Sequence, residues 1–373
     1  MLGTDILGLP GPQAFMDRVC SDVEAGRSAL LVFPRSIIDV GLANDVVDIV
    51  GARLGAGQVQ QGKGHLPTMV AEALDYLDEW RPSGDPWWDL AHWPAMRGRA
   101  ATLRSWEHDV VGLVHRWEAL THEAGSEPTE RLCLVVGAGL ADVEATHLDR
   151  TPSLHFTVHW WWGVVDRLDT ELSLRRRFGV LDPLAHAELV ERTSWDISDL
   201  ARTSAGMRSD FVGAEGNTVD GPCPPRMAMN HDRAVGASRK TPPVAVRPWW
   251  DRGEVDVWDG RYRPSGSGPW ADSESKELRW RAQVQILFPY LEEHRRRIQQ
   301  DFLPKARQAG LAIDPDDAWE LGQMFWAVRD NQVKVSLQTY EHLKRARNVR
   351  NALAHGRPAE RRDIEALLEI IPL

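Results

Sequence analysis

The segment 343–358, LKRARNVRNALAHGRP, holds the side chains of this sequence that are best suited to chemistry. If it forms a helix, Asn351 and His355 lie one turn apart on the same face, and Arg350 lies next to them. The glycine and the proline that follow would end the helix and leave His355 in its last turn or at its cap, partly exposed. Because the unperturbed pKa of an imidazole is about 6.5, such a histidine can accept and return a proton near neutral pH.

Basic side chains crowd around this motif, although the protein as a whole is acidic. The net charge is −10, but residues 271–373 contain 17 Lys and Arg against 16 Asp and Glu. Four of the basic residues flank Arg350, namely Lys344, Arg345, Arg347 and Arg357. A solvated helix face and a phosphate-binding patch both fit a cluster of this kind.

The spacing Arg350-Asn351-x3-His355 resembles the R-x4-H motif of the HEPN family, whose members are small helical bundles and in many cases metal-independent endoribonucleases. The resemblance covers about residues 274–373. It implies that Arg350 binds and polarises the scissile phosphate of RNA, and that Asn351 orients the histidine or the phosphate. His355 would deprotonate the ribose 2′-hydroxyl or protonate the leaving 5′-oxygen. The implied product is a 2′,3′-cyclic phosphate, formed without a metal or a cofactor.

The resemblance also bears on partners, because HEPN sites are usually completed across a two-fold dimer. We therefore expect a homodimer in which RNA phosphates are bound by Lys344, Arg345, Arg347 and Arg357. HEPN domains also serve as non-catalytic modules for dimerisation or RNA binding. Two functions stay open: an RNA-cleaving effector of a prokaryotic defence or toxin system, controlled by the N-terminal half, and a non-enzymatic adaptor. The N-terminal half is the expected place for a regulatory protein partner.

Helices must position this motif. From Ser275 onward the apolar spacing predicts helices to the end of the chain. A first stripe runs from Leu278 to Ile298 and is expected to bend or break near Pro289. Further stripes predict helices around residues 319–328, 333–353 and 364–371. Four antiparallel helices of this size form a compact all-α bundle, which we expect over residues 274–373.

Residues 1–210 are expected to form an α/β domain with a mostly parallel sheet. Apolar runs predict strands at Ala29–Phe33 and Leu132–Val136, and an alternating pattern predicts a strand at Leu154–His159. Helical spacing predicts helices over 13–25, 46–54 and Thr102–Thr121. The run Ala187–Thr193 is interpreted as a last strand, followed by a helix that contains Ile197, Leu200 and Ala201.

The first strand, loop and helix of this domain are where a P-loop would lie. The loop Pro34–Gly41 contains no GK[ST] and a single glycine, so it lacks the residues that wrap and neutralise a phosphate. The strand ending at Val136 is followed by Gly-Ala-Gly rather than by a magnesium-holding acid. The order of elements over 1–205 resembles the inactive, P-loop-derived STAND modules of prokaryotic conflict systems. This implies a degenerate sensing or scaffold domain, with nucleotide binding as the weaker alternative.

Residues 211–273 are rich in Gly, Pro and Ser, which disfavour regular structure. We expect a partly ordered linker between the domains, held on a domain surface by Trp249, Trp250, Trp258 and Trp270. A mobile lid that stacks on bases is the alternative interpretation.

Several classes of protein are disfavoured by the sequence. Cys20, Cys133 and Cys223 have no paired spacing, which argues against a disulfide framework and a cysteine-based zinc site. The N-terminus lacks the pattern of a signal peptide, and no apolar run reaches the roughly 18 residues of a membrane span. We therefore expect an unexported, cytoplasmic protein without a membrane segment.

Overall fold

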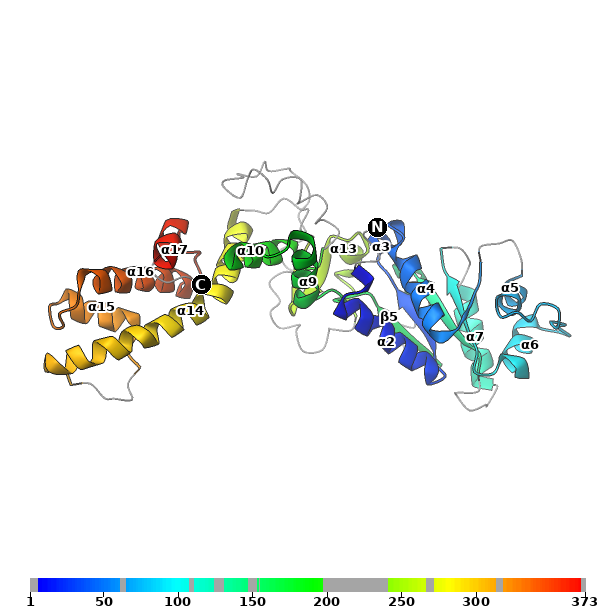
Figure 1. Ribbon diagram of the computed structural model, residues 1–373. Coiled ribbons are helices and arrows are strands. Elements are labelled where there is room, and N and C mark those ends of the chain that lie inside the picture. Colours follow the sequence, from blue (N-terminus) through cyan, green and yellow to red (C-terminus); the bar gives the residue numbers. More distant parts are fainter. Residues whose placement is uncertain are drawn as a thin grey trace. The chain divides into compact units, whose positions relative to one another are not determined.

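A computed structural model describes most of the 373-residue chain (Figure 1). The described residues are 6–60, 65–106, 111–123, 131–146, 153, 155–196, 241–265, 272–312 and 318–369. They fall into two compact units. The first contains the described residues up to 173 together with 194–196 and 241–265, and the second contains 174–193 and 272–369.

The first unit is built on a five-stranded, all-parallel sheet with the strand order β2-β3-β4-β1-β5. The strands are β1 (Ser28–Val32), β2 (Gly57–Gln58), β3 (Ala100–Arg104), β4 (Cys133–Ala138) and β5 (Phe156–Trp160). Strands β1 and β4 are buried along their whole length, because their continuous apolar runs suit a sheet that is covered on both faces. The predicted α/β region with a parallel sheet is thus confirmed.

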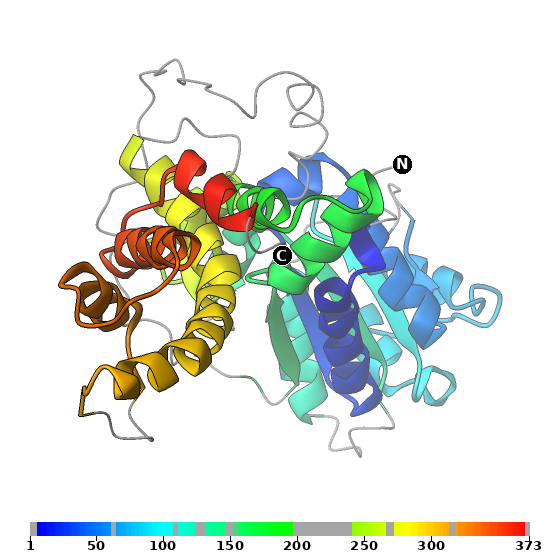
Figure 2. The same ribbon diagram turned by 60° about the vertical axis from the view of Figure 1, so that its left-hand side comes forward.

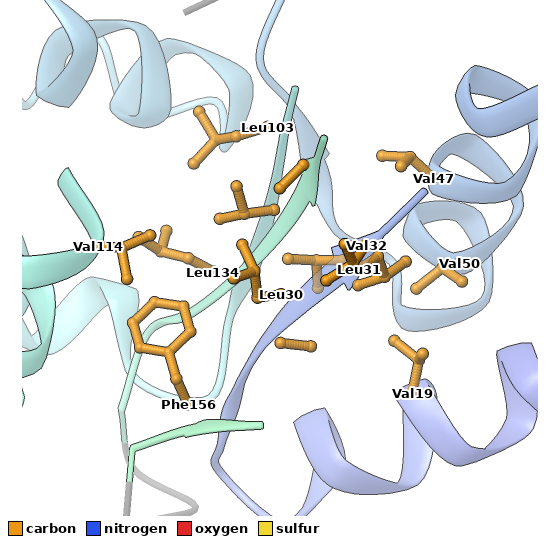
Figure 3. Packing of buried hydrophobic residues seen from close by; sticks show 14 of the residues in the cluster. Val19, Leu30, Leu31, Val32, Val47, Val50, Leu103, Val114, Leu134 and Phe156 are labelled. Carbon is orange, nitrogen blue, oxygen red and sulfur yellow. The ribbon is translucent and has the colours of Figure 1, made fainter. Parts of the chain in front are cut away.

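Helix α2 (Pro10–Glu24) precedes the first strand and α9 (Arg167–Phe178) follows the last. The helices between the strands are α3 (Arg35–Asp39), α4 (Leu42–Leu54), α5 (Leu66–Ala73), α6 (Pro86–His92), α7 (Val111–Glu123) and α8 (Leu140–Thr146). Figure 3 shows Val19, Val47 and Val50 of α2 and α4 on one side of the strands and Val114 of α7 on the other. Successive strand residues point to opposite faces, so each face receives its own apolar layer. The sheet therefore lies between two helical layers.

One predicted helix begins later than expected. Residues 100–104 form strand β3 instead of the start of a helix Thr102–Thr121, and α7 begins at Val111. Ala101 and Leu103 are fully buried. In a strand that is buried on both faces the apolar residues need not alternate, so apolar spacing cannot distinguish it from a helical stripe.

The run expected to be the last strand is also wrong, because residues 187–193 belong to helix α10 (Pro183–Thr193). The start of α10 carries a capping signal. The Asp182 carboxylate accepts hydrogen bonds of 3.0 Å from the amides of Leu184 and Ala185, and Pro183 is the first helical residue. The sequence pair Asp-Pro is therefore a better guide here than the short apolar run.

Regular structure also occurs within the segment expected to be a linker. It comprises α13 (Arg247–Asp251) and an antiparallel hairpin of β6 (Val255–Trp258) and β7 (Arg261–Pro264). The hairpin turn Asp259-Gly260 has positive φ at both residues, 51° and 71°, as an Asp-Gly turn of type I′ requires. Trp250 and Trp258 are each 1% exposed. These residues are part of the first unit rather than a bare connection.

The second unit is helical and contains α10, α14 (Asp272–Gln308), α15 (Leu321–Arg329), α16 (Leu337–Ala354) and α17 (Arg361–Leu368). Figure 2 shows α15 and α16 against the long yellow helix α14, with α17 beside α16. Their shared core includes Leu291, Phe302, Met324, Leu343 and Leu353. Helix α14 is not interrupted at Pro289, and Figure 2 shows it curving along its length, so the expected break is absent and the expected bend is not contradicted. The predicted all-α region is confirmed.

Some expectations fall outside the described residues. They concern the helix around Ile197, Leu200 and Ala201, the whole of the segment 211–240 with Cys223, and Trp270. Cys20 and Cys133 are free thiols. None of the described helices combines the length and the apolar character that crossing a bilayer requires.

Candidate active site

Helix α16 carries the motif and ends where the sequence predicts. Its N-cap is Ser336, whose hydroxyl accepts a 3.0 Å hydrogen bond from the Thr339 amide. His355 is the C-cap residue, and Gly356 follows with a φ of +71°, the left-handed conformation that glycine adopts without steric cost. The His355 side chain is exposed. Helix α16 thus ends at a glycine, and the imidazole of the preceding residue is exposed to solvent.

Two residues of α14 hold this helix end in place. The Trp280 indole donates a 2.7 Å hydrogen bond to the carbonyl of Leu353 in the last turn of the helix, which also accepts a 3.1 Å hydrogen bond from the Gly356 amide. The Gln283 side chain is 2% exposed. Its Oε1 atom accepts a 2.7 Å hydrogen bond from the Ala359 amide, and its Nε2 atom donates a 3.3 Å hydrogen bond to the Ala359 carbonyl. The backbone on both sides of His355 is therefore fixed to a neighbouring helix, although the imidazole itself is free to meet a ligand.

Arg350 binds a carboxylate in this structure. Its Nη2 atom donates a 3.0 Å hydrogen bond to Oε2 of Glu320, and the arginine side chain is 37% exposed. Glu320 is the N-cap of α15 and forms a capping box with Gln323, whose Oε1 accepts a 2.8 Å hydrogen bond from the Glu320 amide. Arg350 is thus an accessible cation at which an anion is already bound.

The side chains of Arg350 and His355 do not point the same way. Five residues along an α-helix correspond to about 7.5 Å along the axis and about 140° around it. Asn351 and His355, four residues apart, differ by about 40° and share a face. One copy of the chain therefore presents Asn351 and His355 together and Arg350 on an adjoining face.

The four flanking basic residues have different surroundings. Arg345 donates a 3.0 Å hydrogen bond to the carbonyl of Ala366 and so ties α16 to α17. Arg347 lies over two aromatic rings of α15, and Lys344 is 3.8 Å from Glu341. Arg357 is exposed directly after the helix end. Arg345 has a structural partner that a phosphate would have to replace, whereas the other three remain at the surface.

Three residues of this site were not found by sequence analysis. Glu320 could have been recognised, because Glu320-x-x-Gln323 before an apolar stripe has the spacing of a capping box. Trp280 and Gln283 carry no such signal. They are spaced like ordinary members of the α14 stripe, and their hydrogen bonds reach more than 70 residues along the chain.

A pair of histidines lies between α14 and α16. The ring centroids of His294 and His342 are 6.3 Å apart, and the Nε2 atom of each is buried without a hydrogen-bond partner among the described residues. Burial lowers the pKa of His294 to about 4, with smaller contributions from His342 and Arg297. Burial also lowers the pKa of His342, assisted by Arg345. Both rings are therefore neutral near pH 7.

The loop after β1, where a P-loop would lie, is occupied by protein groups. It forms the short helix α3, and the amide of Arg35 at its start donates a 3.0 Å hydrogen bond to the Asp251 carboxylate. A side chain at Gly253 would lie 2.6 Å from the Ser36 hydroxyl, so α3 and the turn after α13 are in close contact. An acidic side chain thus takes the amide that would otherwise be available to a phosphate.

The carboxyl edge of the sheet is filled by aromatic rings. Phe33, Trp106 and Trp161 follow the carboxyl ends of β1, β3 and β5. The Phe33 ring centroid is 6.5 Å from Trp106 and 5.8 Å from Trp161, and Phe33 has no exposed surface. Gly137 of β4 leaves the space for the Trp106 ring, which a side chain there would meet at 2.9 Å. In doubly wound folds this edge is the usual place for a ligand.

Comparison with known proteins adds no relative: the chain matches no protein-family model, no curated protein and no solved structure.

Proposed function

We propose that this protein is a metal-independent endoribonuclease of the HEPN type, with Arg350, Asn351 and His355 as its catalytic residues. The observation that carries the proposal is the end of α16. An exposed imidazole stands on a backbone held by Trp280 and Gln283, and five residues earlier on the same helix Arg350 already binds a carboxylate. An anion-binding guanidinium and a proton-transferring imidazole are the two functions that cleavage of a phosphodiester by an internal nucleophile needs.

The proposed reaction uses the 2′-hydroxyl of RNA. One His355 takes the proton of this hydroxyl, and its oxygen attacks the adjacent phosphorus. The bond from phosphorus to the 5′-oxygen breaks, and the leaving oxygen receives a proton from the histidine of a second copy. Arg350 stabilises the charge that develops on the phosphoryl oxygens, and Asn351 orients the imidazole. The products are a 2′,3′-cyclic phosphate and a 5′-hydroxyl.

A homodimer is part of this proposal. One chain offers a single His355, whereas the reaction needs a base and an acid, and Arg350 points about 140° away from His355 around the same helix. Two copies related by a two-fold axis would supply both groups and two arginines.

For the first unit we propose a degenerate P-loop module of the STAND type that acts as a sensor or scaffold and binds a regulatory protein. Two observations support a role other than nucleotide hydrolysis. The Arg35 amide donates a hydrogen bond to Asp251, and the Trp106 ring occupies the space beside Gly137. Control of the helical unit by this module is the arrangement expected of an effector in a prokaryotic defence or toxin system.

The decisive experiment follows cleavage of an end-labelled RNA by the purified protein in EDTA. We expect cleavage that yields a 2′,3′-cyclic phosphate, and a loss of at least about 100-fold in Arg350→Ala and in His355→Ala. The matched control is Arg361→Ala, an exposed arginine of the same unit that is paired with Glu365 and should keep full activity. An excess of the His355→Ala chain should inhibit the wild type, because mixed dimers hold one histidine.

Cleavage that persists in both alanine variants, or that EDTA abolishes, would contradict the proposal. The competing function is a non-catalytic adaptor, in which the helical unit dimerises or docks a partner. In that case RNA stays intact, and the same variants keep cellular activity as long as their oligomeric state in solution is unchanged.

A further inference from the structure

An exposed tryptophan lies one helix away from Arg350. Trp326 on α15 is 43% exposed, whereas its neighbour Phe325 is 5% exposed and stacks on Tyr340 at 5.5 Å. Phe325 thus provides the apolar contact between α15 and α16, and the indole of Trp326 extends beyond it. Its exposed face is apolar surface that a flat ligand could cover.

Two guanidinium groups flank this indole. The Cζ atom of Arg329 lies 4.4 Å from the Trp326 ring centroid, and that of Arg347 lies 5.2 Å from it. Arg347 also lies 4.6 Å from the Phe325 ring. The result is a group of π surfaces with two positive charges. Such a group suits a polyanion that carries flat bases, because a base can stack on an indole or on a guanidinium plane while the adjacent phosphate meets the charge.

The position of this group relative to the candidate active site is fixed by helix α16. Arg347 and Arg350 are three residues apart and so are neighbours on one side of that helix, one turn from each other. Arg350 contacts the residue before the start of α15, and Arg347 contacts the middle of the same helix. Arg347 therefore links the two places: it lies one turn of α16 from Arg350 and 5.2 Å from the Trp326 ring centroid.

We propose that Trp326, together with Arg329 and Arg347, is a base-stacking subsite for single-stranded RNA. It holds the nucleotide next to the phosphate that Arg350 binds. The inference deepens the proposed function, since it names the single strand as the form of RNA that is bound. Charge and aromatic surface coincide at this place, which favours a nucleic acid over a neutral protein partner.

The test measures binding rather than cleavage, so that its outcome is separate from that of the nuclease assay. The probe is a fluorescently labelled 2′-O-methyl RNA oligonucleotide, which lacks the nucleophilic hydroxyl, and the protein is the full chain. Trp326→Ala should weaken binding about tenfold. An oligonucleotide with abasic positions should bind the wild type and this variant equally. Trp249→Ala is the matched control, because Arg252 likewise lies 4.7 Å from that indole, in the other unit.

Salt dependence separates stacking from charge. In Trp326→Ala the slope of log Kd against log salt should stay unchanged, whereas Arg347→Ala should reduce it by about 0.7, the value for one phosphate of a single strand. Trp326→Phe keeps an aromatic ring and should retain most of the affinity, and Trp326→Leu should not. This pair keeps the test valid if the alanine variant folds poorly.

Two results would overturn the inference. One is an equal loss of affinity for the normal and the abasic oligonucleotide in Trp326→Leu. The other is unchanged RNA binding together with a change in oligomeric state by light scattering, which would make this surface a contact between copies of the chain. Absence of RNA cleavage alone would count against the nuclease proposal and leave the stacking subsite in place.

Discussion

The two units place their polar groups differently with respect to solvent. In the first unit the carboxyl edge of the sheet, where α/β proteins ordinarily bind ligands, holds the buried ring of Phe33 between Trp106 and Trp161. In the second unit the end of α16 leaves His355 and Arg357 exposed and Arg350 partly so. In the first unit the place where such folds usually bind ligands is filled by core side chains, whereas the second unit presents exposed ionisable side chains on a helix surface. Fold topology alone would point to the less suitable unit.

Buried ionisable groups show a second contrast. Asp256 of β6 is 7% exposed, and burial raises its pKa to about 8, against the lowering effect of hydrogen bonds from the amides of Gly163 and Val257. In the helical unit, burial lowers the pKa of His294 to about 4. Both groups are kept neutral by burial, but one is an acid and the other a base. The two units should therefore respond to pH in opposite directions.

The largest effect is expected at the aromatic edge. Phe33→Ala removes a fully buried ring and should lower the free energy of unfolding by about 3–5 kcal/mol. His355→Ala, at an exposed cap, should change it by less than about 0.5 kcal/mol. Denaturant unfolding followed by circular dichroism compares the two variants. A mild effect of Phe33→Ala combined with newly gained nucleotide binding would show that the carboxyl edge of the sheet can hold a ligand. It would contradict the contrast drawn between the two units.

A smaller effect is expected at Asp256. Between pH 4 and 8 the folded chain holds a proton on this carboxyl that the unfolded chain releases, so the free energy of unfolding should fall as pH rises. Asp256→Asn stays neutral and keeps an acceptor for the Gly163 amide, so it should remove this dependence. Asp256→Ala leaves that amide unpaired and should cost about 2 kcal/mol. Unfolding measured from pH 5 to pH 8 tests both variants, and an unchanged slope in Asp256→Asn would refute the assignment.

The smallest effect concerns His294 and has the opposite sign. Between about pH 4 and 6.5 His294 is protonated in the unfolded chain but neutral in the folded chain. The free energy of unfolding should therefore fall as pH is lowered. The expected loss is about 2 kcal/mol at pH 4.5 relative to pH 7. His294→Leu should flatten this part of the profile, because leucine does not titrate. The same acid sensitivity in wild type and variant would assign it to other groups.

Sequence reasoning found those elements that carry a local signal. Apolar runs mark β1 and β4, and a glycine marks the end of α16. It missed β3, because a strand buried on both faces has no alternation, and it misread residues 187–193, where Asp182-Pro183 was the better signal. For the site, the polar side chains were visible in the sequence. Trp280 and Gln283 were not, because their partners lie more than 70 residues away and the spacing of α14 does not reveal them.

Under the proposed function, the pairing of Arg350 with Glu320 would affect which anions can bind. While the guanidinium holds this carboxylate, a phosphate finds the arginine occupied, so its apparent affinity is reduced by the fraction of time for which Arg350 is released. Glu320 also caps α15, so it stays nearby after displacement and competes with every anion of the solution. An isolated phosphate, such as that of a free nucleotide, competes poorly against such a tethered acid. A polymer that binds at several points at once competes well. If Arg350 binds phosphate as proposed, this ion pair would favour long polyanions over single phosphates.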